Sequence, residues 1–281
     1  MAVKQMHSAP PTTVEAVRIR PRRTTLWLWL TAPIAVLLAM AAGSGLLVEN
    51  LYRDNPSIVA QAFGQDLITL AVGLPALVIS AIFADRGSTR GRLVWLGVVA
   101  YVVYTYLTYA FGIRFNPLFL AYLALLGCSL YALIGGLATT DFEAGKARFT
   151  ARTPVKAVSV YLAAVAVLFY VVWLSEAVPA VLAGAVPQSV IKDGTPTNVV
   201  YVVDMAWILP ALLLTALWLW RKQAIGYALA GALLTFLALL PLAIVAMAVA
   251  DGSLYAAAGF GSLSALSLGV LVWHLRGVQD T

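Results

Sequence analysis

Hydrophobic residues along the chain gather in long runs that short polar segments separate. Each run is roughly 18–25 residues long, enough to cross a hydrocarbon core about 30 Å thick as an α-helix. Strand-like alternation is absent, and backbone groups in lipid must bond within their own segment, so the pattern predicts helices. We therefore expect an all-α polytopic membrane bundle of about eight transmembrane helices. The predicted spans are residues 26–48, 66–84, 93–111, 117–138, 157–176, 199–220, 225–249 and 254–275.

Basic residues follow every second predicted span, whereas acids gather in the alternate connections. Lys and Arg in short loops are typical of the cytoplasmic side of a membrane. The pattern predicts that these connections and both termini face the cytoplasm, in a cell membrane. The net charge of +6 is thereby explained by topology, and no nucleic-acid partner is expected. The basic residues are Arg86, Arg90, Arg92, Lys146, Arg148, Arg152, Lys156, Arg221, Lys222 and Arg276.

The first 23 residues are polar and end in the pair Arg22-Arg23, which predicts a disordered cytoplasmic tail. An arginine pair before an apolar stretch is also typical of an export signal. The apolar run that follows is roughly 23 residues long, longer than the core of a signal peptide, and this favours a retained first helix.

The composition excludes several classes of protein. Hydrophobic residues make up 62% of the chain and charged residues 11%, less than half the share of roughly 25% in soluble domains. One cysteine, Cys128, cannot form an internal disulfide or a cysteine-framed metal site, and His7 and His274 are too few for a histidine cage. No phosphate-loop, zinc-protease, nucleophile-elbow or dinucleotide motif is present. We expect no metal and no cofactor.

The sequence Leu-Pro-Ala-Leu at residues 74–77 recurs at residues 209–212, and Gly91 and Gly226 follow at the same offset. This recurrence predicts two parallel four-helix repeats, because four helices between equivalent points preserve orientation. The predicted divisions are a tail at 1–23, a first repeat at 24–140, a basic linker at 141–156 and a second repeat at 157–281.

Each predicted repeat has a glutamate at the end of its first helix and an aspartate at the start of its second. Ionisable groups inside a bilayer are costly and face a bundle interior, a partner or water. Counted from the basic loops, Asp204 lies roughly a turn deeper than Asp66, which makes Asp204 the leading functional residue. Asp66 fits an N-terminal cap, and Asp204 fits either a cap or an ion pair with Arg53 or Arg114.

The third predicted helix is rich in hydroxyl groups, and Tyr101, Thr105 and Thr108 share one stripe on it. This stripe indicates a polar cavity or, alternatively, an interfacial tyrosine belt with interhelical hydrogen bonds. We expect a cleft between helices 2, 3, 4 and 6 that is roofed by the outer connections at 49–65 and 177–198. The predicted ligand-binding residues are Asp204, Glu176, Asp66, Glu49, Arg53, Arg114, Asn116, Tyr101, Tyr104, Thr105, Thr108, Tyr122 and Asn198.

Three functions remain open. The first is binding or transport of a small solute or lipid, with the arginines balancing the acids. The second is a membrane-embedded enzyme in which paired carboxylates do acid-base chemistry on an isoprenoid-like substrate, a chemical analogy with membrane terpene cyclases. The third is an accessory membrane subunit. The expected partners are the lipid bilayer and a small-molecule or lipid ligand.

Three stretches resemble multi-pass bacterial membrane proteins of an uncharacterised family: GQDL at 64–67, RGRLVW at 90–95 and FNPLF at 115–119. The resemblance implies a shared topology and carries no activity to this chain.

Overall fold

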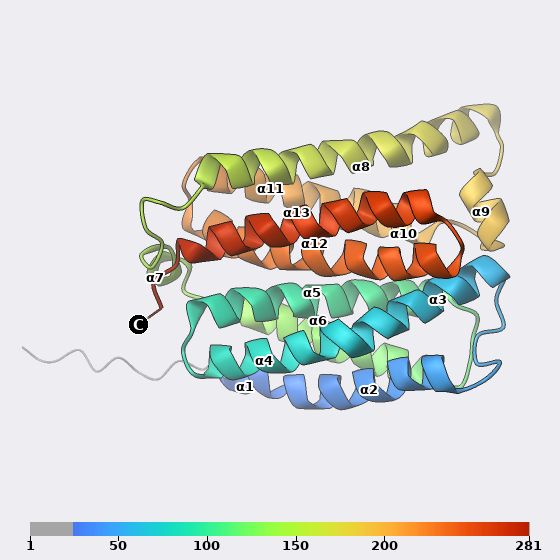
Figure 1. Ribbon diagram of the computed structural model, residues 1–281, viewed down its shortest axis with the longest axis horizontal. Coiled ribbons are helices and arrows are strands. Elements are labelled where there is room, and N and C mark those ends of the chain that lie inside the picture. Colours follow the sequence, from blue (N-terminus) through green and yellow to red (C-terminus); the bar gives the residue numbers. More distant parts are fainter. Residues whose placement is uncertain (1–24, 281) are drawn as a thin grey trace, which may run out of the picture.

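A computed structural model describes residues 25–280 and confirms the all-α class, with eight helices long and apolar enough to cross a membrane. The helices run side by side along the long axis of the molecule (Figure 1). No strand occurs among residues 25–280. The tail predicted at residues 1–23 lies outside the described residues. The spans are α1–α2 (Thr25–Trp29, Thr31–Leu47), α3–η1–α4 (Pro56–Ile68, Thr69–Gly73, Leu74–Asp85), α5 (Thr89–Gly112), α6 (Phe119–Ala138), α8 (Val155–Ala183), α10–η2–α11 (Val199–Val203, Asp204–Ile208, Leu209–Trp220), α12 (Ala224–Ala250) and α13 (Leu254–Arg276).

The second span begins at Pro56 rather than at residue 66, so the predicted start was wrong. Polar residues Ser57 and Gln65 interrupt the apolar pattern there, yet both are buried inside the bundle. Pro56 suits the first turn of a helix because the missing N–H would have no partner there. The fifth span likewise continues past residue 176 to Ala183.

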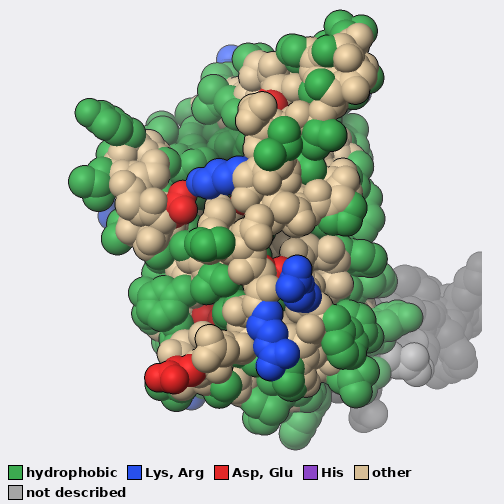
Figure 2. Space-filling view, turned by 90° about the vertical axis from the view of Figure 1, so that its right-hand side faces the viewer, with side chains coloured by type: hydrophobic (Ala, Val, Ile, Leu, Met, Phe, Trp, Pro, Cys, Tyr) green, Lys and Arg blue, Asp and Glu red, His purple; other side chains and the backbone are tan. Residues whose placement is uncertain are grey.

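The molecule has two distinct ends. The basic end contains the α4–α5 and α11–α12 turns, the α6–α8 connection with short helix α7 (Phe142–Lys146), and the segment after α13. The α9 end contains the remaining connections and the short helix α9 (Gln188–Asp193). Figure 2 looks onto the α9 end, where charged side chains of both signs lie among polar groups while hydrophobic side chains cover the flanks.

Helices α5 and α12 form the centre of the bundle and pack against each other. Lipid gives helices no hydrophobic reason to associate, so close packing of small residues has to hold them. A side chain at Gly97 would collide with the α12 backbone at Ala232, and one at Gly231 would press on Leu93. Gly64 brings α3 equally close to the α12 backbone.

Two spans contain a π-helical turn at the same place relative to a proline. The turns η1 and η2 each end directly before a Leu-Pro pair, at Pro75 and Pro210. Proline removes a backbone N–H and its ring collides with the carbonyl one turn earlier, so the preceding turn widens. Thr69 is the first residue of η1, and Asp204 is the first residue of η2.

The α4–α5 and α11–α12 hairpins share their local geometry. The turns place Gly87 and Lys222 in the left-handed region, with φ of 86° and 55°. Gly91 and Gly226 then contact the backbone of the preceding helix at matching positions. The two Leu-Pro-Ala-Leu motifs therefore sit in equivalent hairpins, while the division of the whole chain into two four-helix repeats stays a prediction.

We predict that Gly97→Leu destabilises the bundle by about 1–3 kcal/mol or more, because the new side chain has no space between α5 and α12. The matched control is Gly127→Leu on α6, where a side chain meets no atom within 4 Å. Thermal unfolding of the purified variants measures the difference. Equal melting temperatures for the two variants would contradict the assigned packing.

Candidate functional site

A cavity of about 520 Å³ opens towards the α9 end. Its walls come from α3, α5, α8, the α10–η2–α11 span, α12 and α13, and part of the connection at 184–198 lies at its mouth. The prediction that helix 4 lines the cleft was wrong, because α6 packs against α1, α2 and α5 and contributes no lining residue. Helices α8, α12 and α13 take its place.

Asp204 is the carboxylate on the inner wall of this cavity. It opens η2, is 8% exposed, and accepts a hydrogen bond of 2.9 Å from the indole Nε1 of Trp173. The hydroxyl of Tyr104 on α5 lies beside the same carboxylate. No arginine or lysine pairs with Asp204 in the part of the chain that the structure describes.

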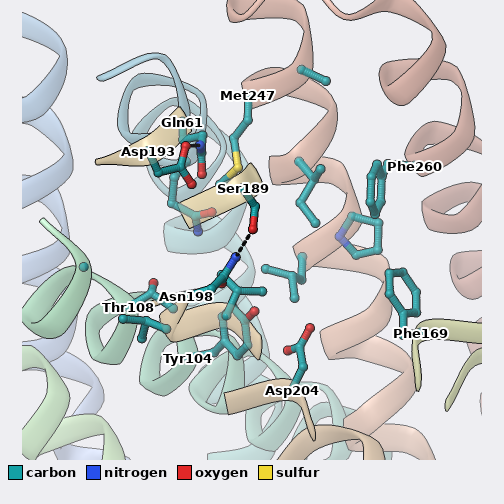
Figure 3. A pocket seen from close by; sticks show the side chains of 18 of the residues that line it. Gln61, Tyr104, Thr108, Phe169, Ser189, Asp193, Asn198, Asp204, Met247 and Phe260 are labelled. Carbon is teal, nitrogen blue, oxygen red and sulfur yellow. Dashed lines mark hydrogen bonds between the residues drawn. The ribbon is translucent and has the colours of Figure 1, made fainter. Parts of the chain in front are cut away.

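Aromatic side chains surround Asp204 (Figure 3). On one side, Phe169 lies 5.9 Å from Trp173 and 6.2 Å from Phe260, measured between ring centroids. On the other side, Tyr104 packs edge to face against Phe236 at 5.5 Å. The carboxylate therefore lies in mainly apolar and aromatic surroundings.

Helix α9 lies over the mouth of the cavity and is held by polar contacts. Lys192 forms an ion pair of 2.8 Å with Asp251, and Gln61 on α3 donates to Asp193 at 3.3 Å. The hydrogen bond with Asp251 raises the pKa of Lys192. Ser189 accepts a bond of 3.3 Å from the Asn198 side chain, drawn in Figure 3. These contacts lie near solvent, where each is worth only about 1 kcal/mol or less.

Glu176 anchors α9 instead of lining the cavity. Its carboxylate accepts a hydrogen bond of 2.8 Å from the backbone N–H of Ser189 and another from the hydroxyl of Tyr201. The cavity wall begins one turn earlier on α8, at Trp173. Asn198 lines the mouth and also caps α10, accepting a bond from the Tyr201 N–H at 3.2 Å.

Asp66 belongs to a second, separate polar cluster. It is 1% exposed and accepts hydrogen bonds from Tyr52 at 2.5 Å and from Tyr109 at 2.9 Å. The prediction that Asp66 caps the second helix was wrong, because α3 already starts at Pro56. Asp66, with 1% of its surface exposed against 8% for Asp204, does not line the cavity.

The hydroxyl groups of α5 divide between two faces. Tyr101 and Thr105 each accept a bond of 2.8 Å from Gln65, next to the Asp66 cluster. Tyr104 and Thr108 instead line the cavity. The predicted stripe therefore serves two sites, because α5 is central and almost all of its faces contact protein.

Five further predicted residues lie away from the cavity. Tyr122 packs edge to face on Tyr109 at 5.3 Å, and its hydroxyl accepts a bond of 3.5 Å from Asn116. Arg53, Arg114 and Glu49 are exposed at the α9 end. Neither arginine forms an ion pair with an acid within residues 25–280, so the expected charge balance with Asp204 and Glu176 is not found.

Sequence reasoning missed the aromatic and aliphatic part of the site. Phe169 and Trp173 lie one helical turn apart on α8, facing Phe260 from α13. Their spacing on a single helix was visible, but apolar residues occupy every face of α8, so no pattern separates its cavity face from its lipid face.

The eight apolar helices make this chain an integral membrane protein, in contact with a lipid bilayer. Its class is a polytopic α-helical bundle with an internal cavity near one end. No family model, no curated protein and no solved structure matches the chain.

We predict that Tyr109→Phe lowers the free energy of unfolding by about 1–3 kcal/mol, because the buried Asp66 carboxylate loses a hydrogen-bond donor. Tyr131→Phe is the matched control, since Tyr131 is 63% exposed on α6. Unfolding of each variant in mixed detergent measures the difference. A Tyr109→Phe protein as stable as the control would show that Asp66 does not depend on this bond.

Proposed function

We propose that the protein binds a mainly apolar small molecule, a lipid or an isoprenoid-like compound, in the cavity beside Asp204. The supporting observation is a buried carboxylate without a cationic partner on the wall of a mostly apolar cavity. Its volume of about 520 Å³ falls within the range of roughly 300–1,000 Å³ for small-molecule sites.

Binding explains why a carboxylate is kept at this position. A charged residue at the centre of a membrane helix costs about 2.5–3.5 kcal/mol on insertion scales. Asp66 recovers stabilisation from two tyrosine hydroxyls, whereas Asp204 leaves part of its hydrogen-bonding capacity towards a cavity. A bound molecule with one polar group would use this remaining hydrogen-bonding capacity of Asp204.

Binding has stronger support than the enzymatic alternative. Paired-carboxylate chemistry needs two acids facing one substrate. Asp66 does not line the cavity, and Glu176 holds α9 in place. The inner wall therefore offers one acid, which suits recognition. Transport would require a second arrangement of the helices in addition to the one that binds the ligand. The π turns before Pro75 and Pro210 are places where the backbone hydrogen bonds already depart from the α-helical pattern.

We also propose that the two halves, 24–140 and 157–281, arose as parallel repeats. The α4–α5 and α11–α12 hairpins support this through their shared π turns, left-handed turn residues and glycine contacts. In this register Thr69, and not Asp66, is equivalent to Asp204, so the acid on the cavity wall belongs to one half alone.

For orientation, we propose that the basic end and both termini face the cytoplasm across the cell membrane. The support is the concentration of Lys and Arg in the connections of that end. The cavity then opens on the opposite, non-cytoplasmic side.

We predict that Leu240→Trp removes ligand binding, because the larger ring fills the cavity from the α12 wall. Extraction of the purified protein and mass spectrometry of co-purified small molecules measure the loss. The matched control is Leu168→Trp, at an exposed position of α8 outside the cavity lining. Equal amounts of the same compound on both variants would place the bound molecule elsewhere.

The orientation is tested by two single cysteines in a Cys128→Ala background. Thr197→Cys at the α9 end should react with a membrane-impermeant maleimide in intact cells, and Ala151→Cys at the basic end only after permeabilisation. Both positions are exposed. The reverse labelling pattern would overturn the proposed orientation.

A further inference from the structure

We propose that the molecule bound in the cavity is an organic cation, an apolar body with an ammonium group held between Asp204 and the aromatic cluster of Phe169, Trp173 and Phe260. This inference rests on the proposed function and adds the chemical class of the ligand. It follows from the charges, the rings and the unfilled hydrogen-bonding capacity of the cavity wall.

The charges of the lining favour a cation. Three aspartates line the cavity, Asp193, Asp204 and Asp251, against one basic residue, Lys192. The ammonium of Lys192 lies 2.8 Å from Asp251 at the mouth and so does not neutralise the inner wall. An anionic ligand would meet this excess of negative charge in a low-dielectric site, where repulsion is strong.

The rings provide the second contribution. A cation within about 6 Å of an aromatic ring centroid is attracted by the negative face of the ring, most strongly by tryptophan. The ring centroid of Phe169 lies 5.9 Å from that of Trp173 and 6.2 Å from that of Phe260. All three rings line the cavity. In Figure 3, Phe169 and Phe260 lie on one side of Asp204 and Tyr104 lies on the other.

The hydrogen bonds of Asp204 leave room for a ligand. An ionised carboxylate has about four acceptor sites. The Nε1–H of Trp173 fills one site at 2.9 Å, and the hydroxyl of Tyr104 lies beside the carboxylate. A neutral ligand would satisfy the remaining sites without balancing the charge, whereas an ammonium group does both.

Equilibrium dialysis with the protein in lipid nanodiscs tests this assignment, with empty nanodiscs subtracted. The probes are decylammonium, the uncharged 1-decanol and the anionic decyl sulfate. We expect wild-type protein to bind the cation at least tenfold more tightly than the alcohol, and the anion least. Asp204→Asn should weaken binding of the cation tenfold or more and change binding of the alcohol less than twofold.

Two matched controls separate this effect from general ones. Asp85→Asn removes an equal charge at the exposed basic end of α4 and should leave all three affinities unchanged. Should Asp204→Asn fail to fold, Phe260→Leu keeps the cavity apolar and should weaken only the cation, by about threefold or more. Its control is Phe83→Leu, at an exposed position of α4.

The outcomes distinguish the two proposals. Equal affinities for the cation and the alcohol in wild-type protein, or a loss of cation binding that Asp85→Asn reproduces, would overturn the organic-cation assignment and leave the apolar binding function standing. Binding of none of the probes would overturn both proposals.

Discussion

A charged group in hydrocarbon finds no partner in the lipid, so each acid inside this bundle must be sheltered by protein or by a bound molecule. The fold meets this requirement in two different ways. Asp66 is closed off, with two tyrosine hydroxyls filling part of its shell. Asp204 accepts a hydrogen bond from the indole of Trp173, has the hydroxyl of Tyr104 beside it, and faces a cavity. Each acid thus has two neighbouring donors, and the two acids differ because protein encloses Asp66 whereas Asp204 lines a cavity.

The architecture that creates this contrast follows from small residues and prolines. Glycines at positions 64, 97 and 231 let α3, α5 and α12 approach closely, which makes α5 and α12 the centre of the bundle. The cavity lies beside this centre, and its walls include residues of α5 and α12 as well as residues of α8 and α13. Pro210 widens the preceding turn, and the resulting π turn begins with Asp204 itself. Sequence features that weaken regular helix geometry thus lie next to the site.

Much of the fold could be read from the sequence, because hydrophobic length is a strong signal for a membrane helix. The helix starts were less certain: Ser57 and Gln65 look like loop residues until the interior that buries them is known.

For the site, Asp204, Tyr104, Thr108 and Asn198 were predicted and do line the cavity, since polar groups stand out in an apolar chain. Which other helices face Asp204 could not be predicted, because an aromatic residue on a membrane helix suits lipid and cavity equally well. Trp95 shows the same ambiguity. Its indole would suit the membrane interface as well as the protein interior, yet it is 2% exposed and donates a hydrogen bond of 2.9 Å to Thr31.

An experimental density map of the protein in a lipid nanodisc would show what surrounds each of the two aspartates. We expect protein on every side of Asp66, and an elongated non-protein density in the cavity that ends at Asp204. Lipid acyl chains should contact neither carboxylate. Acyl-chain density against Asp66 or Asp204 would show instead that a carboxylate in this bundle needs neither protein nor ligand to remain in the membrane.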